Sequence, residues 1–303
     1  MRRAIVTGGA GFIGSHLVDR LLQDGTEVAV VDDLSSGSEA NLPRSVIVER
    51  LDIATDDIGR FFRSWRPDVV FHLAAQSSVP RSIQDPLRDL AVNVVGTHRV
   101  AGAARAADAR RLIFVSSGGA VYGETDAPAD EAGPTAPTSY YGIHKLAAEG
   151  HVALSGVPYA IARPSNVYGA RQSAGLEGAV VASFLAQARD TGVLTIHGDG
   201  LQTRDFIDVR DVVAAIVHLG QSDLPSGIWN VATGRSITIL DLATVIEGAV
   251  GRMGGRAIER RHGPTRPGDV RHSSLSPNRL AAVGWRPDVT LESGIADLAR
   301  AST

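Results

Sequence analysis

Short apolar runs alternate with stretches of helical spacing in the first half of the chain. The runs are rich in valine, isoleucine and leucine, and we expect them to form strands at residues 4–7, 28–31, 46–48, 69–73 and 112–115. Apolar residues recur three or four positions apart between the runs, which predicts helices at residues 12–22, 56–64 and 87–107. Strands that are apolar throughout are buried on both faces. The alternation therefore predicts a parallel sheet with helices on both sides.

The pattern is looser in the second half, where glycine and proline interrupt it. We expect helices at residues 178–189, 209–219, 240–250 and 276–283, and short strands at 194–196 and 228–231. These elements predict a smaller α/β lobe over residues 169–303, packed on a larger α/β domain over residues 1–168. The helix at 208–220 is expected to pack back on the larger domain.

Composition narrows the classes of protein that the chain can belong to. Its 303 residues are 44% hydrophobic and 21% charged, which is typical of a globular protein with a sizeable core. The net charge of −3 provides no general basic field for nucleic acid or an anionic membrane. The absence of cysteine excludes disulfides, thiolate metal sites and a cysteine nucleophile, and the nine histidines show no metal-ligand spacing. We expect a cytoplasmic protein without a metal site.

A glycine-rich segment joins the first predicted strand to the first predicted helix. Glycines stand at positions 8, 11 and 14, where close backbone approach and free amides would suit a pyrophosphate. Asp32 ends the second strand, and a carboxylate there accepts hydrogen bonds from the adenosine ribose. The same carboxylate would repel a 2′-phosphate. The segment therefore predicts a dinucleotide site that favours NAD over NADP.

Tyr141 and Lys145 share one face of a predicted helix, in the segment YGIHK. A phenol has a pKa near ~10, and a neighbouring ammonium together with a positive nicotinamide would lower that pKa. A tyrosine and a lysine four positions apart are, by themselves, common on surface helices. Behind a dinucleotide turn and a strand that ends in SSGGAVYG, we interpret it as a catalytic base and its partner. His144 lies off the Tyr141 face and is assigned no role.

The segment TGGAGFIGSHL and the tyrosine–lysine pair resemble the extended branch of the short-chain dehydrogenases/reductases, the NAD-dependent epimerases and dehydratases of nucleotide-sugars. The resemblance covers the whole chain. It implies a Rossmann-type, doubly wound parallel sheet, NAD as cofactor, a UDP-sugar as substrate and a homodimer. The cofactor residues that it implies are Gly8, Gly11, Phe12, Ile13, Gly14, Asp32, Asp52, Ile53, Leu73, Ala74, Ala75, Asn93, Ser116, Tyr141, Lys145 and Pro164.

The same resemblance implies how the nucleotide-sugar is held. Asn166 in RPSNVYG, Arg204 in GDGLQTRDF and Arg266 in RPGD match positions that bind the substrate diphosphate in the family. Asp269 matches the residue that meets the uridine ribose. Guanidinium groups from distant segments grip diphosphate oxygens well, which fits a chain of acidic net charge.

The chain departs from the family pattern beside the catalytic tyrosine. Counting back from the VYG segment places Gly118 where the family has a serine or threonine that bridges sugar and tyrosine, so Ser117 is expected to replace it. Gly119 and Ala120 stand where dehydratases carry an acid pair, which disfavours dehydration. Ser273 has a small side chain at a position where hexose-restricted epimerases of the family carry a bulky one, so N-acetylhexosamines could fit.

The expected reaction is therefore inversion at carbon 4 of a UDP-hexose through a 4-keto intermediate, with Tyr141, Lys145 and Ser117 as the catalytic group. Tyr141, Ser117 and Ser273 would also contact the sugar. Alternatives remain open at this point: a UDP-GlcNAc epimerase, a UDP-glucuronate epimerase with Arg81 or Arg171 on the C6 carboxylate, another nucleotide-sugar oxidoreductase or decarboxylase, or a non-catalytic NAD sensor.

Overall fold

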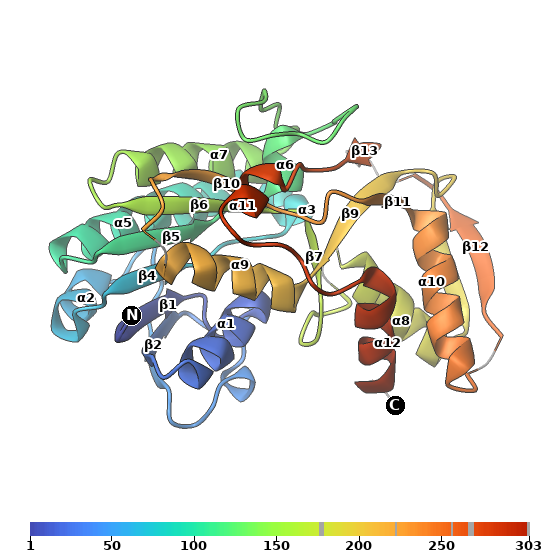
Figure 1. The fold of residues 1–303 in the computed structure, drawn as a ribbon, viewed down its shortest axis with the longest axis horizontal. Helices are drawn as coiled ribbons and strands as arrows, with labels where there is room; N and C mark the ends of the chain where they lie inside the picture. Colours follow the sequence, from blue (N-terminus) through green and yellow to red (C-terminus); the bar gives the residue numbers. More distant parts are fainter. Residues whose placement is uncertain (176–178, 222, 256, 266–269, 302–303) are drawn as a thin grey trace.

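The computed structural model describes residues 1–303 apart from 176–178, 222, 256, 266–269 and 302–303. Its largest element is a seven-stranded sheet in which every paired strand is parallel to its neighbour (Figure 1). From one edge to the other, the strands are β10 (Gly227–Val231), β6 (Tyr159–Pro164), β5 (Arg111–Val115), β4 (Val69–His72), β1 (Arg3–Thr7), β2 (Glu27–Asp32) and β3 (Ile47–Arg50). This is the predicted Rossmann-type sheet.

Helices cover both faces of this sheet, which explains why β1, β2, β4 and β5 are largely apolar and buried. One apolar cluster joins the sheet to α1 (Phe12–Gln23) and α9 (Val209–Gln221). A second cluster, on the opposite face, joins it to α2 (Ile58–Trp65), α5 (Thr97–Ala106) and α7 (Tyr140–Ala153). Figure 1 shows α9 and α1 together on one side of the sheet. Because all strands run in parallel, their carboxyl ends share one edge, and the loops that follow them meet there.

A smaller lobe with its own apolar core stands beside the large sheet (Figure 1). It contains a sheet of β11 (Ser236–Thr238), β9 (Thr203–Asp208), β13 (His272–Ser273) and β7 (Asn166–Tyr168), and the parallel pair β8 (Val193–His197) and β12 (Glu259–Gly263). Its helices are α8 (Val180–Asp190), α10 (Ile239–Arg252) and α12 (Leu291–Ala301). A capping box between Thr238 and Asp241 begins α10.

The chain returns from the smaller lobe to the large sheet. Helix α9, which is the helix expected at residues 208–220, packs against α1 of the larger domain. Strand β10 then pairs with β6, and α11 (Asn278–Ala282) packs on β10, which are further returns that the sequence analysis did not include. A boundary between residues 168 and 169 stays a prediction.

The predicted helix of 87–107 is interrupted. It consists of α4 (Pro86–Leu90), the π-helical segment η2 (Ala91–Gly96) and α5. The remaining short elements are η1 (Glu39–Asn41), α3 (Val79–Gln84) and α6 (Gly118–Tyr122). In the described part of the chain, every helix is too short or too polar to span a membrane.

Candidate functional site

The turn between β1 and α1 admits only glycine at two of its positions. Gly8 has a φ of +72°, and a Cβ on it would lie 2.5 Å from the amide nitrogen of Ala74. A Cβ on Gly14 would lie 2.1 Å from the Gly8 carbonyl oxygen. Helix α1 therefore begins directly against the sheet edge. No side chain caps it at Gly11, so its first amides are available to an anion.

The Gly14→Ala variant should be destabilised, because its methyl group would overlap the backbone of Gly8. Overpacking of this kind costs about 1–3 kcal/mol of unfolding free energy, measured by urea denaturation. The control is Gly102→Ala in α5, where an added Cβ meets nothing within 4 Å. That variant should gain up to about 1 kcal/mol from helix propensity. Equal stabilities of the two variants would contradict this view of the turn.

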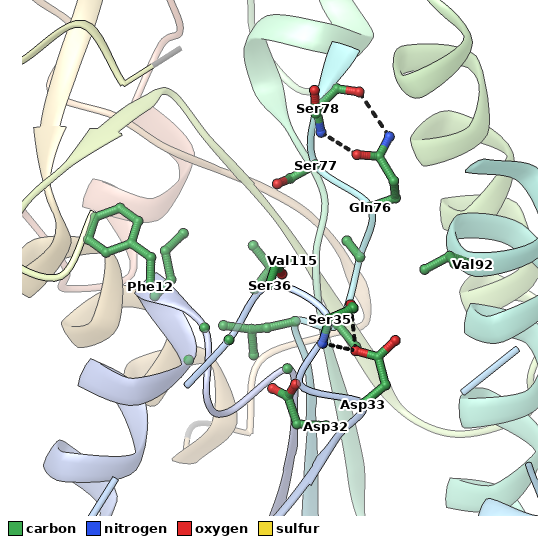
Figure 2. A pocket seen from close by; sticks show the side chains of 18 of the residues that line it. Phe12, Asp32, Asp33, Ser35, Ser36, Gln76, Ser77, Ser78, Val92 and Val115 are labelled. Carbon is green, nitrogen blue, oxygen red and sulfur yellow. Dashed lines mark hydrogen bonds between the residues drawn. The ribbon is translucent and has the colours of Figure 1, made fainter. Parts of the chain in front are cut away.

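A cleft of about 730 Å³ extends from this turn along the carboxyl edge of the sheet (Figure 2). We call it the first cleft. Its lining includes these predicted cofactor residues: Gly8, Gly11, Phe12, Ile13, Gly14, Asp32, Asp52, Ile53, Leu73, Ala74 and Ala75. The cleft is long and lined from several loops, which suits an extended ligand such as a dinucleotide.

Two carboxylates mark the end of the first cleft beyond β2. Asp32 accepts hydrogen bonds from the amides of Ala10 and Leu34, both at 2.9 Å, and burial raises the pKa of its carboxyl. Asp52 accepts from the amide of Ala54 at 2.8 Å and from the Arg88 guanidinium at 2.9 Å. Arg88 was not expected in the site, since nothing in its local sequence indicates that α4 reaches across to β3.

A second cleft of about 780 Å³ adjoins the first, and Ser77, Ser165 and Asn166 line both. The second cleft brings together five predicted substrate residues from both lobes: Ser117, Tyr141, Asn166, Arg204 and Ser273. Arg204 lies on β9 and Ser273 on β13, whereas Tyr141 lies in the first turn of α7. Two clefts that share a wall suit two ligands that react with one another.

Ser117 and Tyr141 both line the second cleft, and Ser117 acts to lower the pKa of the Tyr141 phenol. A Cβ on Gly118 would lie 2.3 Å from the Cδ1 atom of Leu275 and 3.0 Å from the carbonyl oxygen of Pro164. Position 118 therefore faces packed atoms, where a serine side chain has no room. Ser117 lines the second cleft beside Tyr141, and its expected role as the hydroxyl partner of the tyrosine stays a prediction.

The helix of Tyr141 is held close to the loop that carries Ser117. Gly142 makes this possible, because a Cβ there would lie 2.4 Å from the carbonyl oxygen of Ala120. Ser139 caps the helix by accepting a hydrogen bond from the Gly142 amide at 3.1 Å. The segment SYYGIHK thus contains a cap, a close-contact glycine and the catalytic pair.

The expected lowering of the Tyr141 pKa is not found in the protein chain alone. Burial raises the pKa of Tyr141 to about 12, Ser117 opposes this rise, and the charge of Asp89 adds to it. The Lys145 ammonium instead donates to the carbonyl oxygen of Val115 at 2.7 Å. The expectation also counted the positive nicotinamide and left out burial, so for the site with bound NAD it stays a prediction.

A buried ionic network that includes Glu149 lies near Lys145 and favours its charged form. Burial lowers the pKa of Lys145 to about 7, against the opposing charges of Glu149 and Asp89. Glu149 accepts from the Arg163 guanidinium at 2.6 and 2.9 Å and from the Ser116 hydroxyl at 2.5 Å. Glu149 is 4% exposed and Arg163 is 2% exposed. Neither partner was singled out from the sequence, although Glu149 stands one helical turn beyond Lys145.

The other predicted site residues lie outside the lining of the two clefts. Ser116, Lys145 and Pro164 are buried beneath it, and Asn93 is buried while bonding to the backbone of Gln76 at 2.9 and 3.2 Å. Arg81 and Arg171, proposed for a uronate carboxylate, line the first cleft and not the second. Arg266 and Asp269 lie outside the described residues.

The parallel sheet, the glycine turn and the Ser117–Tyr141–Lys145 arrangement define the class of protein: an enzyme of the short-chain dehydrogenase/reductase superfamily. Residues 4–232 match the NAD dependent epimerase/dehydratase family. The chain therefore belongs to that family.

Relatives and solved structures are similar over nearly the entire chain. A UDP-glucose 4-epimerase of Mycolicibacterium smegmatis is 43% identical, with 97% of this chain and 96% of the relative covered. The crystal structure of a Thermus thermophilus UDP-glucose 4-epimerase with NAD has a TM-score of 0.92 at 38% identity, covering 99% of this chain and 100% of the other. A Thermotoga maritima UDP-glucose 4-epimerase with UDP-glucose has a TM-score of 0.91 at 36% identity, covering 98% and 97%.

Proposed function

We propose that this protein is an NAD-dependent 4-epimerase of a UDP-hexose, of the UDP-glucose/UDP-galactose type. The observation that carries the proposal is the position of Tyr141. It lines the second cleft together with Ser117, next to the wall that this cleft shares with the glycine-lined first cleft. The named relatives act as 4-epimerases, or are solved with NAD or UDP-glucose, which supports the same function.

NAD fits the residues of the first cleft. The cradle formed by Gly8 and Gly14 leaves no room for side chains, so a pyrophosphate could approach the backbone and the first amides of α1. Both carboxylate oxygens of Asp32 accept hydrogen bonds from backbone amides. Asp32 also lines the first cleft, where the adenosine ribose could donate to it. Bound NAD supplies the site with a hydride acceptor that can return the hydride.

The chain's own residues supply proton transfer and anchoring. Tyr141 takes the proton from the 4-hydroxyl of the sugar and later returns a proton to the 4-oxygen, with Ser117 beside it in the second cleft. Lys145 provides positive charge beneath the tyrosine. Asn166 and Arg204 hold the diphosphate, so that the flat 4-keto sugar can turn about its link to it. Arg266 and Asp269 remain predictions for the same nucleotide grip.

A hexose suits the second cleft better than a uronic acid. Apart from His197, Arg204 is the only basic side chain among the described residues that line this cleft. Arg171 is paired with Asp19 at 2.7 Å, at the side of the first cleft. A C6 carboxylate would therefore lack the arginine partner that the sequence analysis considered for it.

An N-acetylhexosamine is the second candidate substrate. Ser273 and Gly119 line the same part of the second cleft, and a Cβ on Gly119 would lie 3.5 Å from the Ser273 hydroxyl. Two small residues at this place leave the wall open where a bulky side chain would close it. Ser273→Tyr should then lose UDP-GlcNAc turnover while keeping UDP-glucose turnover.

The direct test is to incubate the purified protein with UDP-glucose and look for UDP-galactose by anion-exchange chromatography. Formation of the 4-epimer without net consumption of NAD is the expected result. Release of carbon dioxide from UDP-glucuronate, or net reduction of added NAD, would favour a decarboxylase or dehydrogenase. Binding of NAD without any change in the sugar would favour a non-catalytic sensor.

A homodimer in the cytoplasm is part of the proposal. Exposed apolar side chains gather on α3, α4, η2 and α7, which contact one another: Ile83, Leu87, Leu90, Val95, Tyr140 and Ile143. An exposed apolar surface built from several adjacent helices fits a second copy of the chain.

Ile143→Glu should therefore yield a monomer, because a carboxylate would have to be buried in the interface. Sedimentation equilibrium measures the mass directly. Leu201→Glu is the matched control, since Leu201 is as exposed as Ile143 but lies in the smaller lobe. A dimer that persists in Ile143→Glu, or a wild-type monomer, would contradict the proposed face.

A further inference from the structure

His144 lies behind the catalytic pair and bonds to a buried carboxylate from another helix. Its Nδ1 atom is 2.5 Å from the Oδ2 atom of Asp89 on α4. Asp89 is 1% exposed and His144 is 9% exposed. His144 directly precedes Lys145 and follows Tyr141 by three positions, so any shift of this bond acts on the helix that carries both.

Asp89 also bonds to the wall that the two clefts share. The Gln76 side-chain amide donates to its Oδ1 atom at 2.6 Å, and the same amide donates to the carbonyl oxygen of Ser78 at 2.9 Å. The Ser78 amide donates back to Gln76 at 2.7 Å, as Figure 2 shows. Ser77, between them, lines both clefts. One carboxylate thus connects the wall of residues 76–78 to the helix of Tyr141.

We infer that His144 and Asp89 form a positioning pair, in which the bond between imidazole and carboxylate holds the wall of residues 76–78 against the Tyr141 helix and shields the Asp89 carboxylate from the site. The inference rests on the proposed function. A carboxylate buried to this degree requires hydrogen-bond donors, and His144 can supply one to Oδ2 while the Gln76 amide supplies one to Oδ1. The charge of Asp89 already raises the pKa of Tyr141, which shows that the two groups interact.

Several of the other ionisable groups around α7 have partners elsewhere, and the ring of Tyr140 stacks on His144. The helix packs against α3, α4, η2, α5, α6, β5 and β6. Arg88 pairs with Asp52, Arg99 with the carbonyl oxygens of residues 54–56, Arg163 with Glu149, and Arg111 with the carbonyl oxygen of Leu224. The remaining ionisable side chains of these elements and of α7 are Arg81, His98, Arg105, Tyr122, Tyr140, His151 and Tyr159. The charge of Asp89 affects the pKa of both Tyr141 and Lys145, and it raises both.

The test compares the pH dependence of kcat in His144→Asn, Asp89→Asn and the double variant. In His144→Asn the unshielded carboxylate should move the acid limb of kcat up by about one pH unit, so that turnover below the limb falls about tenfold. Asp89→Asn should move the limb down, and the double variant should return near the wild type. KM for UDP-glucose should change little, since neither residue lines the second cleft. The control is His151→Asn, an exposed histidine of the same helix.

An unmoved limb in both single variants would overturn the inference, because a merely structural pair would lower stability without shifting the limb. Should His144→Asn fail to fold, the downward shift in Asp89→Asn decides. If the wild type shows no epimerisation, the proposed function fails by itself. Ionisation of Tyr141, read as the ultraviolet difference between each variant and its Tyr141→Phe form, then still tests the pair: a phenol that titrates at the same pH with and without His144 would overturn it.

Discussion

Tyr141→Phe should epimerise UDP-glucose about a thousandfold more slowly than the wild type, within the range of rate loss on removing a general acid–base group. The phenol is the proposed base in the second cleft, and phenylalanine keeps its ring and its packing. NAD content should be unchanged, since the first cleft is lined by other residues. Initial rates with both epimers, together with bound NAD measured after gel filtration, provide the comparison.

Tyr140→Phe is the matched control for this prediction. Tyr140 is adjacent in sequence but is 47% exposed and stacks on His144 with ring centroids 6.2 Å apart. Its hydroxyl is not needed by the mechanism, so turnover should stay close to that of the wild type. Loss of turnover in Tyr140→Phe with retention in Tyr141→Phe would reverse the assignment of the base.

Glu149→Gln should lower the free energy of unfolding by about 3–5 kcal/mol, the usual cost of leaving one member of a buried ion pair alone. Arg163 is 2% exposed and makes both of its charged hydrogen bonds to Glu149, so its guanidinium would keep its charge without a counter-charge. Urea denaturation measures the loss. Turnover should fall as well, because Glu149 favours the charged form of Lys145.

Two further variants distinguish the loss of the buried ion pair from a general effect of substitution on stability. The double variant Glu149→Leu, Arg163→Met removes both charges and should recover most of the lost stability. Glu27→Gln breaks the half-exposed pair of Arg3 and Glu27 at 2.8 Å, and its effect should stay below about 1 kcal/mol. A loss in Glu149→Gln no larger than that in Glu27→Gln would contradict the assigned role of the buried pair.

The local pattern of apolar residues predicted most of the strands and helices of the fold. The five apolar runs of the first half predicted the strands β1 to β5, and β1, β2, β4 and β5 are buried over most of their length, as an unbroken apolar run indicates. The edge strand β3 is exposed or half-buried at every position. Strand β6 was missed although it lies inside the same sheet. Arg163 and Pro164 interrupt its apolar pattern, and only the long-range partner Glu149 explains why an arginine is buried there.

The site was predictable where its residues follow one another along the chain. The glycine turn and the Tyr141–Lys145 spacing belong to this kind, whereas the role of Ser117 stays a prediction. Contacts between distant segments were not accessible. His144 was assigned no role because its partner Asp89 stands 55 residues earlier, and Arg88 reaches Asp52 from a helix 36 residues away. The raised pKa of Tyr141 also depends on burial, which periodicity does not measure.

The central claim is that one sugar carbon is oxidised and then reduced within a single closed site. UDP-galactose that carries deuterium at carbon 4 tests it most directly, in the presence of unlabelled NADH. We predict that the UDP-glucose formed keeps its deuterium at carbon 4 and that none enters the free cofactor. Loss of the label to solvent or to added NADH would contradict the claim.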